Sequence, residues 1–461
     1  MEENKLSVGI KLGYGSSFLS INLFFIIMSF VLLNYMTDAV GLSAALTGIA
    51  LMVGRIVDAF YDPLIGYISD RTKTKMGRRR PFMLVGVIPL WIAMVVMFTN
   101  PALVAGSGIS QIAIFIYTLV VFLIVYIAFS TVSIPYMALA PELTADYNER
   151  SSLNGYCFIF AAVGTLLGSA LALPIVAMAS DKNMGFVLMG LILGAVIFVV
   201  TLITVFTVRE PANLKPVSSM GFTKSFTEVF RNRPYVIIWL SFVLNMMAVS
   251  FASGILIYYF KYVLGAESTV TYAMLALIAS SIVFIPVSVM LSKKFGKKLV
   301  YGTGFIIFAA MLMVLFFFSH IFGLEFTLIS MAIMGIGLGF TQAMPNAIVA
   351  DAIEYDYLRT GERREGAFFG IWTWGLKMGQ ALAVLIMGLV LEAMGYIPNL
   401  IPQPEMAQLG IRLFLGPISA GIFILAAIIL YFYPITETRY KEIRAQIAEM
   451  EAGKASTLPL T

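Results

Sequence analysis

Residues 55–81 read RIVDAFYDPLIGYISDRTKTKMGRRRP and place charged side chains inside an apolar segment. Asp58 and Asp62 stand four residues apart in the apolar part, and a basic cluster follows at 71–80. An ionised carboxylate in hydrocarbon is costly unless it is paired, hydrated or bound to an ion. We therefore expect a membrane-embedded helix whose two acids have a function, and we interpret the rest of the chain as their setting.

The composition is that of an integral membrane protein. Of the 461 residues, 60% are hydrophobic and only 12% are charged, and the mean hydropathy is +0.93. A soluble domain carries about 25% charged residues. The apolar segments reach the roughly 20 residues that a spanning helix needs, and they lack the alternation of barrel strands. The sequence therefore predicts an all-α membrane protein.

Hydropathy and loop charge together predict the topology. The basic loops are 71–80, 209–233, 293–298 and 359–364, whereas the loops after the first and third apolar segments carry no Lys or Arg. Basic loops stay in the cytoplasm, so we expect both termini to be cytoplasmic. The predicted spans lie near residues 15–36, 42–69, 82–99, 108–138, 152–179, 185–208, 235–263, 269–292, 299–319, 325–350, 366–394 and 411–433.

The chain also divides into two related halves. We expect six-helix bundles at 1–208 and 235–433, joined by a polar connection at 209–234 and followed by a cytoplasmic tail at 434–461. The segments Pro135–Ala140 and Pro345–Ala350 end the fourth and tenth predicted spans with the same spacing. Parallel repeats of this kind are typical of transporters with a substrate site between the halves.

Several classes of function are excluded or disfavoured. One cysteine and one histidine leave no disulfide framework or metal-ligand pattern, and no phosphate-binding loop is present. We expect no enzyme activity, no cofactor and no ATP-driven transport, and no filter-like loop favours a channel. The net charge of +5 comes from loop residues, which orient helices rather than bind nucleic acid. The N-terminus lacks a cleavable leader, so the first span is expected to be retained.

The strongest candidate site is a cation site on the second predicted span. Arg55, Asp58 and Asp62 fall on one helical face, and Pro63 frees a backbone carbonyl one turn earlier. Two carboxylates and a hydroxyl suit Na⁺ or a proton, and the candidate hydroxyls are Ser130, Thr131 and Ser133 of the fourth predicted span. The alternative is a structural salt bridge between Arg55 and Asp58, and Arg55 is expected to balance charge in either case.

Polar residues at mid-span are the candidates for substrate binding. Lys377 lies too far from either helix end to reach water easily, so we expect it to meet an anion in a cavity, with membrane-surface snorkelling as the alternative. Trp374 shares its face and could stack on a sugar ring or simply pack. Asn22 and Gln342 could bind a polar substrate or join helices.

The end of the second predicted span carries a second set of charged residues, separate from the cation site. Asp70, Arg71 and Arg78 flank the loop that closes at Gly77. Basic residues at this position are what topology alone requires. We therefore predict a cytoplasmic gate and topology anchor here rather than a substrate site.

These motifs resemble a known family. Residues 66–80 resemble the signature loop of the major facilitator superfamily, and 35–42, 55–66 and 395–399 resemble its melibiose permease-like branch, the glycoside–pentoside–hexuronide:cation symporters. The resemblance implies a twelve-helix major facilitator fold, coupling-cation residues at Asp58, Asp62 and Ser130, and the family lysine at Lys377. Its galactoside-binding acids fall on Asn22 and Ser133, and its helix 10 tryptophan falls on Gln342.

The expected function is therefore cation-coupled symport. We predict uptake of a small organic solute, most plausibly a sugar or glycoside, with Na⁺ or H⁺ by alternating access. Animal relatives with the same acids and lysine transport lysophospholipids with sodium, so a lysophospholipid or other amphiphile is the alternative substrate. We expect a multi-pass protein of the cell membrane, monomeric in the bilayer and without a nucleic-acid partner.

Overall fold

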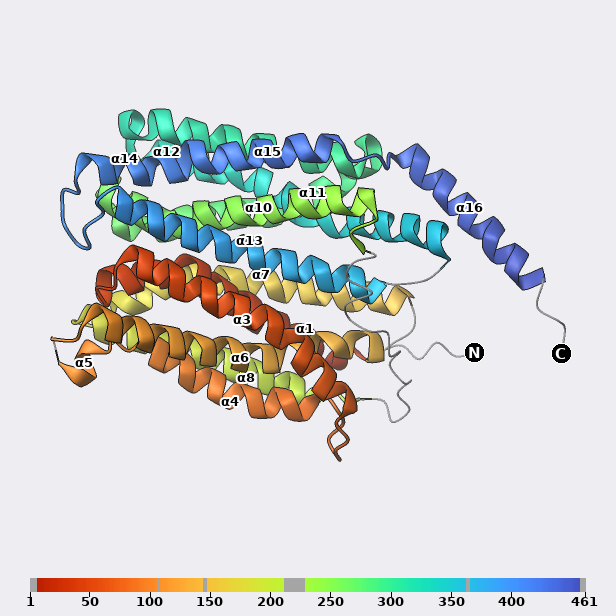
Figure 1. Ribbon diagram of the computed structural model, residues 1–461, viewed down its shortest axis with the longest axis horizontal. Helices are drawn as coiled ribbons and strands as arrows, with labels where there is room; N and C mark the ends of the chain where they lie inside the picture. The colour runs from red at the N-terminus through yellow and green to blue at the C-terminus, as the bar shows by residue number, and fades with distance from the viewer. Residues whose placement is uncertain (1–5, 107, 144–146, 211–228, 362–364, 457–461) are drawn as a thin grey trace. The chain divides into compact units, whose positions relative to one another are not determined.

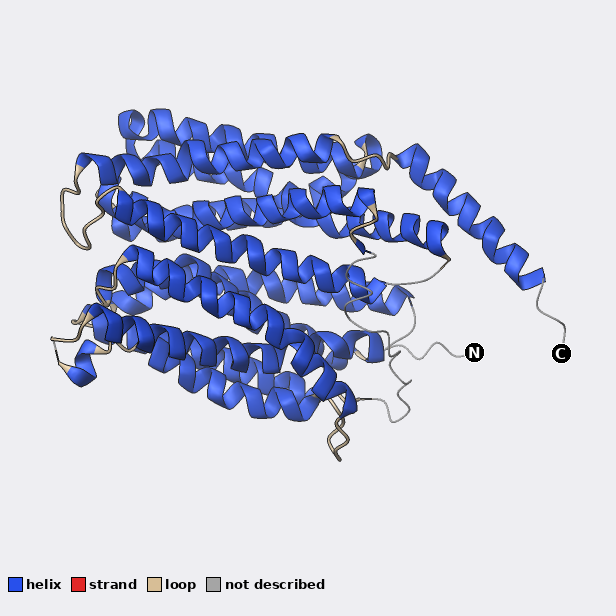
Figure 2. Ribbon diagram, viewed as in Figure 1, coloured by secondary structure: helices blue, strands red, loops and turns tan. Residues whose placement is uncertain are grey.

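The protein is helical throughout the part that the structure covers. The computed structural model describes residues 6–456 except 107, 144–146, 211–228 and 362–364. Within these residues every regular element is a helix (Figure 2). In a bilayer, helices satisfy all backbone polar groups within one segment. The predicted all-α class is confirmed.

The helices follow one another with short connections (Figure 1). Most are α-helices, three short segments are π-helices, and one is a 3₁₀-helix. Their bounds are α1 Val8–Phe30, α2 Leu32–Asn34, η1 Tyr35–Ala39, α3 Ala44–Arg71, α4 Arg80–Met97, α5 Ala102–Ala105, α6 Gln111–Leu143, α7 Tyr147–Ala177, α8 Lys182–Thr207, α10 Arg233–Tyr258, η2 Tyr259–Val263, η3 Glu267–Thr269, α11 Val270–Phe295, α12 Lys297–Thr360, α13 Glu365–Ala393, α14 Glu405–Leu413, η4 Phe414–Ile418, α15 Ser419–Tyr431 and α16 Glu437–Ser456.

The membrane-spanning segments agree with the hydropathy prediction. Eleven helices among the described residues are long and apolar enough to cross a membrane. One of them, α12, is interrupted at Gly323, whose φ of 74° and ψ of −155° are not helical. Glycine adopts this positive φ without a steric penalty. The predicted spans 299–319 and 325–350 lie on either side of Gly323, so α12 supplies both.

The predicted start of the first span is wrong by about two turns. Helix α1 begins at Val8, and the Ser7 side chain caps it by accepting a hydrogen bond from the Ile10 amide at 3.3 Å. Polar residues in this first part lowered its hydropathy, but they are buried and paired. Lys11 forms an ion pair with Glu149 at 3.0 Å.

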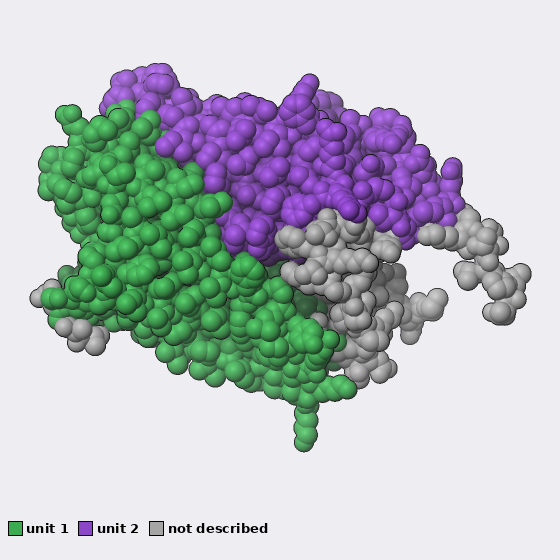
Figure 3. All heavy atoms as spheres, viewed as in Figure 1, with its two compact units in different colours: residues 1–217, 250–275, 381–414 green, residues 218–249, 276–380, 415–461 purple. Residues whose placement is uncertain are grey.

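Two compact units make up the chain (Figure 3). Unit 1 contains residues 1–217, 250–275 and 381–414, and unit 2 contains residues 218–249, 276–380 and 415–461. Unit 1 therefore includes the distal parts of α10 and α13 together with all of α1 to α8. Most of the predicted connection at 209–234 lies outside the described residues, as the gap at 211–228 shows.

Glycines allow close helix packing inside each unit. In unit 1 a Cβ on Gly164 would collide with the Leu19 carbonyl of α1, and in unit 2 a Cβ on Gly335 would collide with the Leu277 carbonyl of α11. The motifs at 164–168 and 335–339 therefore act by letting backbones approach.

The tail contains a helix that packs against unit 2. Ile443 and Ile447 of α16 are buried, and Arg444 forms an ion pair with Glu354 of α12 at 3.0 Å. This helix lies within the segment 434–461, which was expected to be a cytoplasmic tail. The structure adds its docking on α12, which fixes the position of residues 437–447 relative to the membrane-spanning part of unit 2.

Candidate functional site

The predicted cation site forms where α3 and α6 pack together in unit 1. Asp58 and Arg55 are buried on α3, with 1% and 3% of their surface exposed. Ser130 of α6, which is fully buried, donates a hydrogen bond to Asp58 Oδ1 at 2.5 Å. A hydrogen bond to an ionised acceptor is shorter and stronger than a neutral one. The structure thus brings together three of the residues that the sequence singled out.

Close approach of the two helices explains this contact. Gly54 of α3 lies against the ring of Phe122 on α6, and a Cβ at Gly54 would collide with that ring. Since Gly54 is four residues before Asp58, it stands one turn away on the same side of the helix. The glycine therefore lets α3 carry its carboxylate up to the Ser130 hydroxyl.

Tyr126 is a residue of this site that the sequence analysis missed. The Arg55 guanidinium carbon lies 5.5 Å from the centroid of its ring, a cation–π distance. Its hydroxyl oxygen is buried and has no hydrogen-bond partner among the described residues. Tyr126 precedes Ser130 by four residues on α6, so this spacing was the available signal.

Asp62 stands one turn beyond Asp58 on α3 and is half-buried. Pro63 follows it without ending the helix, which continues to Arg71. The hydroxyl of Tyr61, which precedes Asp62 in the sequence, lies 3.2 Å from that of Thr131 on α6. The described residues contain no group of three or more His, Cys, Asp and Glu side chains that could hold a metal ion. A cation here would therefore take hydroxyl or carbonyl oxygens besides carboxylates.

The substrate candidates of unit 1 lie on α1 and α6. Asn22 is half-buried and donates its amide hydrogen to the Phe18 carbonyl of its own helix at 2.8 Å. Its amide oxygen is the part that remains for a ligand or another helix. Ser133 is buried, with 4% of its surface exposed, one turn beyond Ser130 on α6. Ser133 thus shares the helix, and nearly the face, of the cation-site hydroxyl.

The substrate candidates of unit 2 have different environments. Lys377 is buried on α13, with 6% of its surface exposed, so it does not extend to an aqueous surface. Trp374 is half-buried. Its ring stacks on that of Trp239, with the ring centroids 6.2 Å apart and the ring planes inclined by 7°. This contact favours the packing interpretation of Trp374. Gln342 is exposed on α12.

The loop after α3 is organised by Glu210, which the sequence analysis also missed. The Glu210 carboxylate accepts hydrogen bonds from the backbone amides of Arg78 at 2.6 Å and of Arg79 and Arg80 at 2.9 Å. These amides open helix α4, whose N-terminus carries partial positive charge. An acid just after α8 was the signal, but only the folded chain brings it to this loop.

The predicted gate residues around this loop take several roles. The Arg71 guanidinium lies over the ring of Tyr67 at 3.5 Å, and Arg79 donates a hydrogen bond to Ser69 Oγ at 2.6 Å. Arg78 contributes its backbone amide to Glu210. Asp70 belongs to α3, but its side chain lies outside the described part of the chain. The described contacts hold the end of α3 to the start of α4.

A second buried cluster in unit 1 centres on Asp38, where α1 ends in the π-helix η1. Asp38 accepts hydrogen bonds from Lys261, which also forms an ion pair with it, from Tyr262 at 2.5 Å and from Tyr396. Asn399 donates to the Asp38 backbone carbonyl at 2.5 Å and accepts from Lys261 at 2.8 Å. We call these five residues the Asp38 cluster.

The Asp38 cluster joins three connections that are distant in the sequence. Its members lie in η1, in the π-helix η2 that ends α10, and between α13 and α14. π-helical turns often occur at functional sites. Burial raises the pKa of Tyr396, and Tyr258 and Asp38 add to this effect, so its hydroxyl keeps the proton that it donates. The sequence showed Asp38, Tyr396 and Asn399 only as parts of family motifs, and it did not single out Lys261 or Tyr262.

Comparisons with known proteins agree with the fold. The model of the family described as MFS/sugar transport protein matches residues 13–437. An uncharacterised symporter of Bacillus subtilis is 30% identical over 95% of this chain and 94% of its own. A glucuronide carrier protein homologue of Escherichia coli is 28% identical over 94% of both chains. The crystal structure of a mutant of the nucleoside transporter NupG is similar in fold, with a TM-score of 0.66 and 15% identity over 92% of this chain and 99% of that one.

Proposed function

The chain belongs to the MFS/sugar transport protein family of the major facilitator superfamily, and we propose that it is a cation-coupled symporter of a sugar or glycoside. The predicted resemblance to the glycoside–pentoside–hexuronide:cation symporters is thereby confirmed, as is the prediction of a multi-pass membrane transporter rather than an enzyme. The observation that carries the proposal is the buried contact between Asp58 and Ser130. It provides a carboxylate and a hydroxyl inside a membrane-spanning segment.

The coupling ion, Na⁺ or H⁺, is proposed to bind at Asp58 and Asp62 with the Ser130 hydroxyl. The set of Arg55, Asp58 and Asp62 has a net negative charge while both acids are ionised, and a bound cation neutralises it. An uncompensated charge is most costly when the site is closed from water. Cation binding therefore favours the closed conformation through which the bound substrate crosses the membrane. By linkage, bound substrate raises the cation affinity by the same factor as the cation raises the substrate affinity.

We propose that the substrate meets Asn22, Ser133, Gln342, Trp374 and Lys377. Their amide, hydroxyl and ammonium groups suit the hydroxyl groups of a sugar, and buried Lys377 would bind a polar or anionic substituent. A hydrogen bond to a charged group contributes about 1.5–3 kcal/mol. Lys377 is therefore the proposed determinant of affinity, while the stacked Trp374 would shape the site.

Alternating access is the proposed transport cycle, with six-helix halves at 1–208 and 235–433 joined by 209–234 and both termini in the cytoplasm. The Asp38 cluster lies in η1, η2 and the α13–α14 connection, which follow odd-numbered predicted spans, whereas the basic loops follow even-numbered ones. We propose that it closes the external side. The Glu210-bound loop after α3 is the proposed anchor on the cytoplasmic side.

The test is neutralisation of Asp62. In proteoliposomes, Asp62→Asn is expected to abolish cation-driven accumulation while leaving substrate exchange, because the substrate groups remain. A matched control is Asp181→Asn, which changes an exposed carboxylate at the start of α8. A thermal-shift screen of sugars with and without Na⁺ first identifies the substrate. Wild-type cation stimulation in Asp62→Asn would disprove the coupling role.

A further inference from the structure

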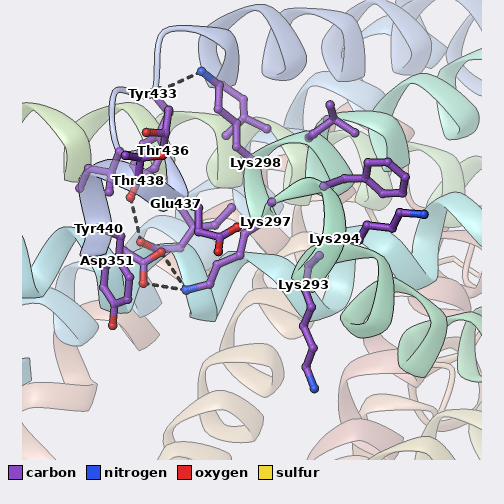
Figure 4. A pocket seen from close by; sticks show the side chains of 18 of the residues that line it. Lys293, Lys294, Lys297, Lys298, Asp351, Tyr433, Thr436, Glu437, Thr438 and Tyr440 are labelled. Atoms are coloured by element: carbon purple, nitrogen blue, oxygen red, sulfur yellow. Dashed lines mark hydrogen bonds and ion pairs between the residues drawn. The ribbon is translucent and has the colours of Figure 1, made fainter. Parts of the chain in front are cut away.

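A cavity of about 930 Å³ lies in unit 2, where α11 meets α12 and the chain leaves α15 for α16 (Figure 4). All its walls come from unit 2. Five lysines and two carboxylates line it. We call it the lysine pocket and define it by its cations, which are Lys293, Lys294, Lys297, Lys298 and Lys441.

Two of the five cations are balanced by carboxylates. Lys297 forms an ion pair with Asp351 at 2.7 Å, and Lys441 forms one with Glu437 at 2.7 Å. Figure 4 shows the Lys297 ammonium directed at Asp351. The pocket's two acids are thus both engaged by lysines, and the remaining three lysines share no further acid in its lining.

The three remaining cations are Lys293, Lys294 and Lys298. Lys298 donates hydrogen bonds to the carbonyls of Tyr431 and Tyr433 at 2.7 and 2.8 Å, which fixes its position without cancelling its charge. Lys293 and Lys294 are exposed and extend outward from the rim in Figure 4. Their long flexible stems allow both ammonium groups to turn toward an anion. The rim therefore carries an excess of about three positive charges.

The wall beside these lysines is apolar and open on its outer side. Phe295, Leu299 and Tyr431 line the pocket and are 52%, 58% and 75% exposed. All three lie at ends of membrane-spanning helices, so their exposed surfaces meet the edge of the hydrocarbon layer. The pocket therefore offers apolar contact and cationic groups at the depth where a lipid places its acyl chains and headgroup.

Topology alone explains basic residues at this surface, but it requires neither a cavity nor an apolar wall beneath them. Anionic headgroups attract juxtamembrane lysines. We propose that the lysine pocket binds the headgroup of an anionic phospholipid, with its acyl chain along Phe295 and Leu299 and the tail helix α16 forming one wall. Lipid occupancy would then hold α16 against α12.

The test measures lipid binding to the purified full-length protein by native mass spectrometry. Phosphatidylglycerol is titrated against phosphatidylcholine for wild type and for Lys293→Gln/Lys294→Gln. The matched control is Lys73→Gln/Lys75→Gln, which removes two exposed lysines from another basic loop. Each lysine near an anionic lipid contributes about 1 kcal/mol, or about fivefold. We expect roughly twentyfold weaker phosphatidylglycerol binding in the pocket variant and little change in the control.

Three results would overturn the proposal. Equal weakening in the pocket and control variants would show that only general surface charge attracts the lipid. Equal binding of phosphatidylglycerol and phosphatidylcholine by wild type would show that the headgroup charge is not recognised. Binding of glycerol 3-phosphate as tight as that of phosphatidylglycerol would assign the pocket to a soluble anion. Since the readout is lipid binding, it does not depend on whether the protein couples transport to a cation.

Discussion

Replacing Asp38 with asparagine tests whether the Asp38 cluster holds one side of the protein closed. Asparagine keeps the shape but removes the negative charge and converts one oxygen acceptor into a donor. The Lys261 ammonium then loses its ion-pair partner, and the hydroxyls of Tyr262 and Tyr396 compete for a single acceptor oxygen. The closed arrangement is destabilised relative to any arrangement in which these groups reach water.

The size of this destabilisation depends on how deeply the Lys261–Asp38 pair is buried. The side chains of Lys261 and Asp38 are 7% and 1% exposed, and breaking a buried pair by removing one partner costs about 3–5 kcal/mol. Lys261 keeps Asn399 as an acceptor at 2.8 Å and lies 4.7 Å from the ring centroid of Tyr262. We therefore expect the lower end, about 3 kcal/mol, which is roughly a hundredfold change in the opening equilibrium.

The assay is hydrogen–deuterium exchange of the protein in nanodiscs. Peptides covering 34–42, 258–266 and 394–400 are expected to exchange together, up to a hundredfold faster, because local exchange follows the opening free energy. Peptides from 160–177, which pack against α1 away from the cluster, are expected to stay unchanged. Asp181→Asn again serves as the exposed carboxylate control.

A double-mutant cycle gives the refutation. Lys261→Met removes the cation but leaves Asp38 with hydrogen-bond donors, and combining it with Asp38→Asn leaves no uncompensated charge. The double variant should therefore open less than Asp38→Asn alone. Exchange in Asp38→Asn within threefold of wild type, or faster exchange in the double variant, would refute the reasoning.

Four further predictions follow from other contacts. Ser130→Ala removes a charge-assisted hydrogen bond to Asp58, which contributes about 1.5–3 kcal/mol. The cation concentration that gives half-maximal ligand binding should therefore rise at least tenfold, and an unchanged value would show that Ser130 does not belong to the cation site. Gly48→Leu places a Cβ 3.0 Å from the Val384 carbonyl, so overpacking of about 1–3 kcal/mol should lower the melting temperature, whereas an unchanged melt would contradict this close approach. Glu210→Gln should speed amide exchange at 78–82 by about tenfold, measured against an unchanged 160–177. Because the folded-state pKa of Tyr396 is raised above its ordinary value of 10.0, the opening free energy at the cluster should be constant from pH 6 to 9 and should fall only above pH 10. It is obtained from exchange rates divided by the intrinsic amide rates at each pH, and a transition near pH 7 would contradict the prediction.

Most of the fold could be predicted because hydropathy reports a local property of each segment. The all-α class, the spans and the interruption near Gly323 were all readable from apolar runs and turn residues. The start of α1 was not, since Lys11 is buried by pairing with Glu149, which is 138 residues away. A hydropathy window cannot register a partner that lies outside it.

The candidate site was predictable only where its residues share one helix. Spacing placed Arg55 and Asp58 on one face, and family resemblance added Ser130, which the structure brings into contact. Spacing could not show that Tyr126 completes this group or that Trp374 stacks on Trp239. Those facts depend on which helices become neighbours.

The sequence by itself thus determined that this chain is an all-α membrane protein with two acids on one helix face, because segment hydropathy and helical periodicity are set within about twenty residues. Only the tertiary structure decided what those and other charges meet. The Asp38 cluster draws Lys261 and Tyr396 from segments more than two hundred residues along the chain, and Glu210 reaches the amides at 78–80 in the same way. Contacts of this kind are fixed by helix packing, which places distant residues at one point and which local sequence does not encode.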